Sequence, residues 1–465
     1  MKKLVVLMLL VTAIAVMAAC GTGGGGTPTT PTTPATPATQ PAGQAAQQDG
    51  GDAEVVGGRH LTISYRPLTP EWAEYHRVFY QVPLQEAFPN DTIEFILIPD
   101  RQTLHIQVAA GAGPNVMLLD GATDAIEFAS SGRILALDGW AEQYGWADIF
   151  YDWAYATNYW QGRLYGLPIN FEGMGIYYNL DVLEMLGHNV PQTHEELLAL
   201  IHACVEAGIM PFAFGNANAQ GVVDWLYSMF LTAYAGPEAL REAVQGTRSW
   251  NDPLIRGSIE MMVEWWQNGW ITNGASQAIT ITDARTMFAE GQAAMTMEGS
   301  WLGGHMVRTF TDTNWTVEPM PGLRPGVRNN VALATGGSYV INASAPDPDF
   351  AAEVLNWMFT TVDRHQGSVV EASFQPYPIR AIDAGFFYGM DPGLAHMYDM
   401  LMSAMEENRV GWCAWTFFAA PVRAFMNENT DALFLGIMTI DDFLAEVQTI
   451  SDAAVAAGDI PPFPQ

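Results

Sequence analysis

Residues 162–197 read GRLYGLPINFEGMGIYYNLDVLEMLGHNVPQTHEEL and give the clearest indication of how the chain folds. Residues 163–170 have the composition of a short strand, which we expect to end at Pro168 because proline has no amide hydrogen for a sheet ladder. Residues 175–179 form a second β-prone run, and residues 180–186 have the period of a short helix closed by a glycine. The pattern predicts a crossing point between two lobes.

Glu172 stands between these two strands, flanked by Phe171 and Gly173. A carboxylate beside an aromatic residue and a glycine, on a connection between two structured units, is placed as ligand-contacting residues often are. We therefore treat Glu172 as a candidate ligand-binding residue, with a solvated loop acid as the open alternative. Asn170 and Gly173 are candidate hinge residues.

Six motifs in the same order resemble the family 1 extracellular solute-binding proteins, the maltose-binding-protein-like receptors of ATP-binding-cassette sugar importers. Together they span residues 59 to 454, and no single motif is diagnostic by itself. Besides residues 162–197 they are AAGAGPNV at 109–116, SGRILALD at 131–138, FAEGQAAMTMEGSW at 288–301, GGSYVINASAPDPDFAAEVLNWMF at 336–359 and LGIMTIDDFLAEVQTISDAA at 435–454.

The resemblance implies an α/β chain with the two-lobed periplasmic-binding-protein fold of type II. Each lobe would be a mostly parallel sheet flanked by helices, and the lobes would be joined by a hinge of several crossings. The implied N-terminal lobe comprises residues 59–168 and 338–375, and the C-terminal lobe residues 169–337 and 376–465. Further crossings are expected near Thr335 to Ser338, with Gly336 and Gly337 as hinge residues, and near Gln375 to Pro378.

The same resemblance implies function. The protein would capture a sugar or oligosaccharide between its lobes, act as a monomer, and deliver the ligand to the permease subunits of an importer without chemistry on it. It would need no cofactor and no metal. The chain shows no HExxH, GxSxG, CxxC or P-loop motif. Two alternatives stay open: the same fold with a cationic or other non-sugar solute, and a secreted carbohydrate-active enzyme using a carboxylate pair.

The amino terminus indicates export. Lys2 and Lys3 precede an apolar run that is too short to span a bilayer, followed by Ala18-Ala19-Cys20. We expect residues 1–19 to be a lipoprotein signal peptide and Cys20 to carry lipid at the outer face of the bacterial cytoplasmic membrane. An uncleaved anchor is the alternative. Residues 20–58, rich in threonine, proline and glycine, predict a disordered tether.

Charge excludes some partners. Beyond Lys3 the chain has no lysine, which leaves 17 arginines against 50 acidic residues. This balance excludes binding to nucleic acid or to an anionic membrane surface, because both need a basic patch. It also weighs mildly against polyanionic ligands. Cys204 and Cys413 could pair, although the helical apolar face around Cys204 favours a buried thiol.

The remaining candidates lie at strand ends and crossings. Three strands are expected near residues 61–65, 93–98 and 115–119, and ligands of open α/β sheets bind at the carboxyl ends of strands. Asp124 could instead cap a helix, and Trp301, which by the resemblance packs on a sugar ring, could instead be a structural residue. Which of Trp412, Trp415, Phe417 and Phe418 faces the ligand is left open. The ligand-binding candidates are Trp72, Asp120, Asp124, Glu172, Trp225, Glu298, Trp301, Tyr377 and Trp415.

Overall fold

The structure, a computed structural model, describes residues 58–65, 70–98, 101–217, 223–383 and 385–463. The chain divides into two units, Met1–Val55 and Val56–Gln465, and the fold given below is that of the second. The predicted signal peptide, Cys20 and residues 21–57 of the predicted tether lie outside the described residues. Among the described helices, none is long and apolar enough to cross a membrane.

The first lobe begins with the expected alternation of strands and helices. Strand β1 pairs in parallel with both β2 and β3, so the early part of the chain forms the predicted parallel unit. Its elements are β1 (His60–Tyr65), α1 (Pro70–His76), the π-helix η1 (Arg77–Gln81), α2 (Val82–Ala87), β2 (Thr92–Leu97), α3 (Arg101–Ala109), β3 (Val116–Leu119), α4 (Gly121–Ser130), α5 (Asp138–Tyr144), α6 (Trp146–Ile149), α7 (Asp152–Ala156), β4 (Tyr159–Trp160) and β5 (Arg163–Leu164).

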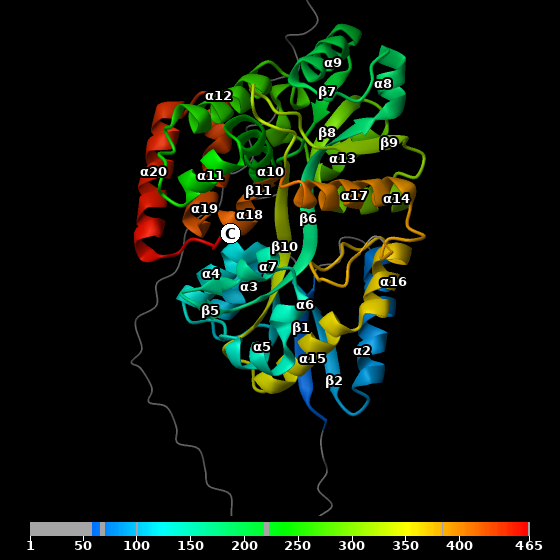
Figure 1. Ribbon diagram of the computed structural model, residues 1–465, viewed down its shortest axis with the longest axis vertical. Helices are drawn as coiled ribbons and strands as arrows, with labels where there is room; N and C mark the ends of the chain where they lie inside the picture. The colour runs from blue at the N-terminus through cyan, green and yellow to red at the C-terminus, as the bar shows by residue number, and fades with distance from the viewer. Residues whose placement is uncertain (1–57, 66–69, 99–100, 218–222, 384, 464–465) are drawn as a thin grey trace, which may run out of the picture. The chain divides into compact units, whose positions relative to one another are not determined.

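Two long strands, β6 (Leu167–Asn179) and β10 (Val331–Ile341), connect the lobes (Figure 1). The expectation that a strand ends at Pro168 is wrong, because β6 runs without interruption through the predicted connection. Pro168 pairs with Ser338 of β10, whereas β8 pairs with β6 only from Met174 onward. At Pro168 the strand therefore has a neighbour on one side, where a missing amide hydrogen is tolerated.

The second crossing is also a continuous strand, since β10 includes the predicted Thr335 to Ser338 segment. The predicted hinge residues Asn170, Gly173, Gly336 and Gly337 thus lie inside crossing strands, and rotation about them stays a prediction. The third crossing, near Gln375 to Pro378, is irregular, and the backbone amide of Phe171 donates to the carbonyl of Pro376 at 2.7 Å.

The sheet order is β2-β1-β3-β10-β6-β8-β7, with β11 beside β10 and β9 beside β6. The sheet is mixed rather than mostly parallel. The pairs β1–β2, β1–β3, β7–β8 and β10–β11 are parallel, whereas β10–β3, β10–β6, β6–β8 and β6–β9 are antiparallel. The physical reason is that β6 and β10 cross between the lobes in opposite directions and bring an antiparallel partner into each.

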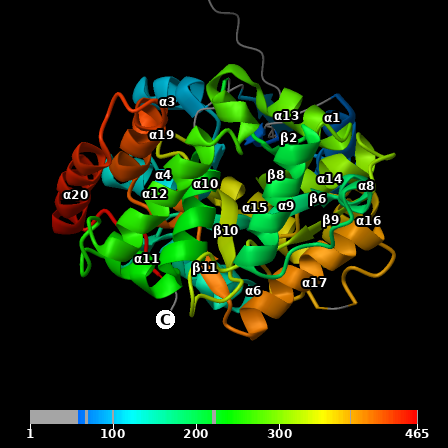
Figure 2. The ribbon, with the colours of Figure 1, turned by 90° about the horizontal axis from the view of Figure 1, so that it is seen from above.

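Helices surround the second-lobe strands when the molecule is seen from above (Figure 2). A capping box at Thr193 starts α9: the Glu196 amide donates to the Thr193 hydroxyl, and the Gln192 amide donates to the Glu196 carboxylate. The elements are α8 (Leu180–Leu186), α9 (His194–Ala207), β7 (Met210–Ala213), α10 (Val223–Phe230), the π-helix η2 (Leu231–Ala235), α11 (Pro237–Val244), α12 (Pro253–Gln267), the 3₁₀ turns η3 (Thr272–Gly274) and η4 (Ser276–Ala278), α13 (Ile281–Ala289), β8 (Ala293–Gly299), α14 (Trp301–Arg308) and β9 (Trp315–Glu318).

After β10 the chain returns to the first lobe and then to the second. Helix α15 packs its buried face with first-lobe residues such as Leu61 and Trp146. The late aromatic residues join the second-lobe core, which also contains Cys204 and Cys413 as free, buried thiols. The elements are α15 (Pro348–Thr360), α16 (Val362–Ala372), α17 (Pro392–Glu406), β11 (Val410–Trp412), α18 (Ala414–Phe417), α19 (Ala420–Phe434) and α20 (Ile440–Ala457).

The chain stays in contact with first-lobe residues after the third crossing. We expected the second lobe to resume at residue 376. Ile379 instead forms a β-bridge with Phe150, and the Arg380 amide donates to the carbonyl of Ile149. These contacts favour a boundary later in the chain, and the exact lobe limits stay a prediction.

Candidate functional site

Glu172 lies at the point where the crossings meet. Its side chain is buried, with 5% of the residue exposed, and its Oε1 occupies space that a Cβ at Gly336 would approach to 1.9 Å. Position 336 therefore needs a glycine because a larger side chain would clash with the Glu172 carboxyl, and not because of its backbone angles. The alternative that Glu172 is a solvated loop acid is wrong.

Burial raises the pKa of the Glu172 carboxyl to about 8. Hydrogen bonds from Gln375, Asn170 and Trp415 lower this pKa, whereas the negative charge of Asp120 raises it. At pH 7 most of these carboxyls carry a proton, so Glu172 can both donate and accept a hydrogen bond. Its hydrogen-bond partners come from strand β6, from the second lobe and from the third crossing, while Asp120 of the first lobe acts on it through its charge.

Three tryptophans of the second lobe stand next to one another, and one of them, Trp415, bonds to Glu172. The ring centroid of Trp301 lies 5.0 Å from that of Trp225 and 5.8 Å from that of Trp415. Trp301 and Trp225 are half-buried, and the Trp301 ring lies so close to Gly299 that a Cβ there would come within 2.2 Å of it. Of the four aromatic residues left open by the sequence, Trp415 is the one that bonds to Glu172.

Trp72 contributes an aromatic ring from the first lobe. Its ring stacks on His305 of α14 at 5.8 Å and meets Phe374 edge-on at 5.6 Å. The guanidinium carbon of Arg308 lies 4.8 Å from the Trp72 ring centroid. Burial lowers the pKa of His305 to about 3, and Arg285 and Arg308 lower it as well, so this imidazole is neutral. First-lobe and second-lobe residues are thus in contact here.

A cavity of about 140 Å³ lies beside this contact. Trp72, Asn170, Gln375 and Tyr377 are among the residues that line it. Tyr377 is only 4% exposed and stacks on His365 at 3.9 Å, so one face of its ring belongs to the core. Small-molecule sites usually enclose about 300 to 1,000 Å³. A sugar would therefore need the lobes to separate before it enters.

Asp124 takes part in a buried ion network between the lobes. It lies 3.7 Å from Arg423 of α19, which also pairs with Asp224 of α10, and both acids are almost fully buried. The N-cap residue of α4 is Asp120, so the alternative that Asp124 caps this helix is wrong. Close contact of the lobes here requires Gly121, whose φ is +72° and where a Cβ would come within 2.3 Å of the Trp415 carbonyl oxygen.

Glu298 has a different setting from the one we expected. It is buried in β8, and its carboxylate accepts from Arg285 Nε at 2.9 Å. A nitrogen of the same guanidinium lies 3.4 Å from His305 Nε2. Glu298 holds Arg285 in place, and the indole of Trp301 also bonds to its carboxylate.

Sequence reasoning missed Arg423, Arg285, His305 and Gln375. Arg423 comes from a part of the chain far from its partners, whereas Arg285 precedes Glu298 by 13 residues. None of the four residues stands in a short motif with a recognisable spacing. The excess of acidic residues over arginines did indicate that buried ion pairs would be present, because a buried arginine in such a chain is expected to pair with carboxylates. Among the described residues, no three histidine, cysteine or acidic side chains gather in a way that could hold a metal ion.

Comparison with known proteins identifies the family. A sequence profile of the bacterial extracellular solute-binding proteins matches residues 70–363. The chain belongs to this family. An uncharacterized ABC transporter extracellular-binding protein of Pyrococcus horikoshii is 25% identical over 215 residues, which are 46% of this chain and 47% of that protein. The melibiose/raffinose/stachyose-binding protein of Bacillus subtilis is 23% identical over 50% of this chain and 54% of its own length.

The matched parts thus span about half of these two curated solute-binding proteins. Solved structures support the fold over more of the chain. A chitin oligosaccharide binding protein, 20% identical, superposes with a TM-score of 0.74 over 86% of this chain and 99% of its own. A maltose-bound Thermotoga maritima protein, also 20% identical, gives a TM-score of 0.68 over 85% and 100%. The two-lobed fold of the extracellular solute-binding proteins is therefore the fold of this chain.

Proposed function

We propose that this solute-binding protein captures a neutral sugar or oligosaccharide between its lobes and delivers it to the permease of an ATP-binding-cassette importer. The observation that carries the proposal is a set of aromatic rings connected to Glu172 from both lobes. Trp415 bonds to Glu172 and lies next to Trp301, which lies next to Trp225. From the first lobe, Trp72 lines a cavity together with Asn170 and Gln375, which both bond to Glu172. Sugars present hydroxyl groups at their edges and C–H groups on their faces. Aromatic rings and hydrogen-bonding side chains match both.

The binding free energy expected of such a site is on the scale that a solute receptor needs. An aromatic contact adds about 0.5 to 1.5 kcal/mol beyond the area it buries in protein pairs, which gives a scale for stacking on a sugar. A hydrogen bond contributes about 0.5 to 1.5 kcal/mol when both partners are neutral and about 1.5 to 3 kcal/mol when one of them is charged. Several contacts of both kinds approach the roughly 8 kcal/mol of a micromolar complex.

The charges around the site do not decide between a neutral and a cationic ligand. Arg423 lies beside two buried carboxylates, Asp124 and Asp224, whereas Arg285 pairs with Glu298. The two carboxylates outnumber Arg423 by one. Glu172 is largely protonated at pH 7 because of its raised pKa. The aromatic rings, rather than the charges, are therefore what favours a sugar at this site.

A thermal-shift screen over mono- and oligosaccharides tests the proposal, because a ligand that binds only the folded state raises stability by RT ln(1 + [L]/Kd). We expect at least one neutral carbohydrate to raise the melting temperature, with an affinity that changes little with salt. Affinity that falls steeply with salt would indicate a charged ligand instead. The carbohydrate should be recovered unchanged after incubation, and its cleavage would contradict a purely binding function.

We also propose that the protein acts as a monomer anchored through lipid on Cys20 at the outer face of the cytoplasmic membrane, with residues 21–58 as its tether. The support is the signal-peptide pattern that ends in Ala18-Ala19-Cys20. Cys20→Ala should release the protein from the membrane fraction or block its processing, with Cys204→Ala as the control. Unchanged membrane association together with a lipid-free amino terminus would contradict the anchor.

A further inference from the structure

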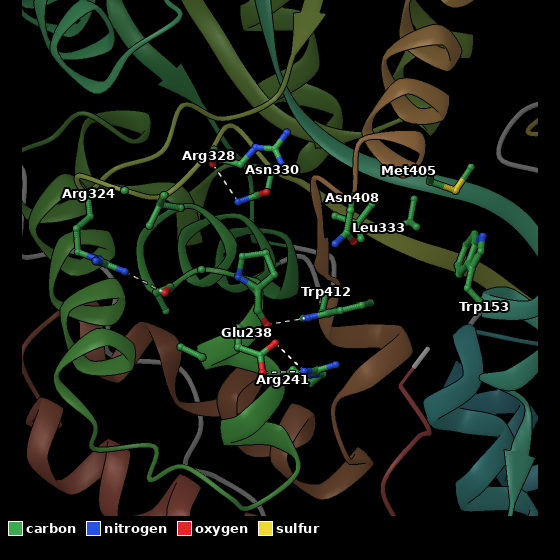
Figure 3. Close-up of a pocket in the computed structure, with 17 residues that line it drawn as sticks. Trp153, Glu238, Arg241, Arg324, Arg328, Asn330, Leu333, Met405, Asn408 and Trp412 are labelled. Carbon is green, nitrogen blue, oxygen red and sulfur yellow. Dashed lines mark hydrogen bonds and ion pairs between the residues drawn. The ribbon is translucent and has the colours of Figure 1, made fainter. Parts of the chain in front are cut away.

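A second and larger cavity lies away from the tryptophans of the candidate site. Its volume is about 610 Å³, and it shares no lining residue with the 140 Å³ cavity beside Trp72. Trp153 of α7 lines it from the first lobe, Leu333 lines it from the crossing strand β10, and the remaining residues come from the second lobe (Figure 3). Its volume is that of an ordinary small-molecule site.

The charge of this cavity is opposite to that of the chain. Three arginines line it, Arg241, Arg324 and Arg328, against a single acidic residue, Glu238. The chain as a whole has 50 acidic residues against 19 basic ones. In this acidic protein, the positive side chains that line the cavity therefore outnumber the negative ones. Such a cavity attracts anions from solution.

The partners of the arginines leave part of this charge unmatched. Arg241 Nη2 pairs with Glu238 at 2.7 Å, and Arg328 lies 3.8 Å from Glu407. Arg324 donates to the backbone carbonyls of Tyr234 and Ala235, at 3.1 and 3.3 Å. In the described part of the chain no carboxylate lies within ion-pair distance of Arg324. Its charge is thus met by neutral carbonyls alone.

The walls of the cavity combine this charge with a fixed aromatic surface. Trp412 is 8% exposed, and its indole N–H donates to the carbonyl of Pro237 at 2.8 Å, which holds the ring in place. Asn330 and Asn408 add amide groups to the lining. An organic ligand with a ring or short apolar part and one or more oxyanion groups would match this combination.

We propose that this cavity is a second binding site, for a small organic anion that carries carboxylate or phosphate groups. Guanidinium groups present planar pairs of N–H donors that fit the oxygens of both groups. The acid excess of the whole chain weighs against anionic ligands in general, and this cavity is the local exception. The proposal goes beyond the carbohydrate site and does not rest on it.

Calorimetric titration of the purified full-length protein with citrate and with inorganic phosphate tests this site, with sodium chloride added to hold the ionic strength constant. We expect saturable binding of at least one probe; the two arms separate carboxylate from phosphate recognition. Arg324→Gln should weaken that binding about tenfold or more, the scale of one lost charge-assisted hydrogen bond. Arg241→Gln should weaken it about threefold or more.

Arg241→Gln removes only a partly exposed pair within one helix, so the variant folds and tests the site even if Arg324→Gln does not. Arg77→Gln is the matched control, because Arg77 pairs with Glu74 at the same spacing and does not line the cavity. It should bind the probes as the wild type does. The proposal is overturned if neither probe binds saturably, or if Arg77→Gln weakens binding as much as Arg241→Gln does.

Discussion

Trp301 is supported on one side by Trp225 and Trp415 and rests against Gly299, while its ring remains only half-buried. A ring held this firmly loses little freedom when a ligand stacks on it. It can therefore contribute to affinity without a large entropic cost. The same packing means that the ring contributes something to stability, so binding and folding need to be measured separately.

Trp301→Ala should lower carbohydrate affinity by about 1 to 3 kcal/mol and leave the ligand-free melting temperature nearly unchanged. Trp270→Ala is the control, since Trp270 is also half-buried in the second lobe but packs on His202 and Trp265. A loss of folding free energy of roughly 3 to 5 kcal/mol, as for a core tryptophan, would show that Trp301 is structural. Unaltered affinity in a folded variant would show the same.

Glu172 makes stability depend on pH. Because its folded pKa of about 8 exceeds the ordinary carboxyl value of 4.5, the folded state holds a proton that the unfolded state releases above pH 4.5. The resulting stabilisation is present below pH 4.5 and is lost as the pH rises to about 8. Glu172→Gln removes this dependence, so its melting temperature should rise relative to the wild type between pH 5 and pH 8, by roughly 2 °C or more.

Two comparisons check the origin of this effect. Glu290→Gln, at the end of a surface helix, should leave the pH profile of the wild type unchanged. A Glu172→Gln profile parallel to that of the wild type would mean that the carboxyl is ionised in the folded protein.

Affinity of Glu172→Gln for a sugar should fall by about 1 to 3 kcal/mol if the carboxyl bonds to the ligand.

Among individual residues, the sequence identified candidate site residues that stand in a recognisable motif. It missed residues that come into contact only when distant parts of the chain fold together. Glu172 was found because an aromatic residue and a glycine flank it, and Trp301 because it follows a strand end in a motif that resembles the family. The partnership of Arg423 with Asp124 could not be found, because it joins helices of different lobes and neither helix carries a sign of the other. The sequence also gave no indication that Glu298 is held by Arg285.

Strands β6 and β10 position the site because they pass through it side by side. Ala334 pairs with Glu172 and Gly337 with Ile169, so the register of this pair sets Gly336 against the Glu172 carboxyl. A shift of one residue would turn the carboxyl to the other face of the sheet. The pairing therefore fixes the carboxyl more firmly than a loop would.

Gly336→Ala should disturb this pair, because the added methyl group would overlap the carboxyl oxygen. We expect a loss of about 1 to 3 kcal/mol in unfolding free energy, measured by denaturant titration, and weaker carbohydrate binding. Gly139→Ala is the matched control, since nothing lies within 4 Å of a Cβ there. Unchanged stability and affinity of Gly336→Ala would mean that the carboxyl has room to move away from β10.

The prediction of helices and strands was accurate where the local sequence determines the element. It failed where the element depends on which strand pairs with it. The early strands follow from their β-prone composition, and helix α8 follows from its periodicity and the glycine that closes it. The break expected at Pro168 did not occur, because the unpaired side of β6 accepts a proline, and sequence alone cannot show which side of a strand is unpaired. The mixed character of the sheet was missed for the same reason.

The two lobes are in contact in this structure, through Trp72 with His305 and through Asp124 with Arg423. The 140 Å³ cavity beside these contacts is too small for an ordinary ligand, so a ligand needs an arrangement of the lobes that is more open than this one. The family and its two-lobed fold were predicted correctly, since several ordered motifs carry that information. Sequence motifs do not report how far apart the lobes stand.

Solution scattering with and without a saturating carbohydrate should show a smaller radius of gyration in the bound state, because hinge closure is the usual motion of two-lobed receptors. The same chain is used in both measurements, so segments outside the lobes cancel. A carbohydrate that does not bind serves as the control. An unchanged radius with proven binding would contradict closure about the crossings.

The pairing of β3 with β10 has a consequence for how this protein is made. Neither lobe is a contiguous piece of the chain, because the first-lobe sheet includes a strand that the ribosome synthesises only after most of the second lobe. Contacts between distant parts of a sequence form slowly. The nascent polypeptide therefore stays without a complete sheet until late in its synthesis, a property that suits a chain expected to cross a membrane through a translocase before it folds.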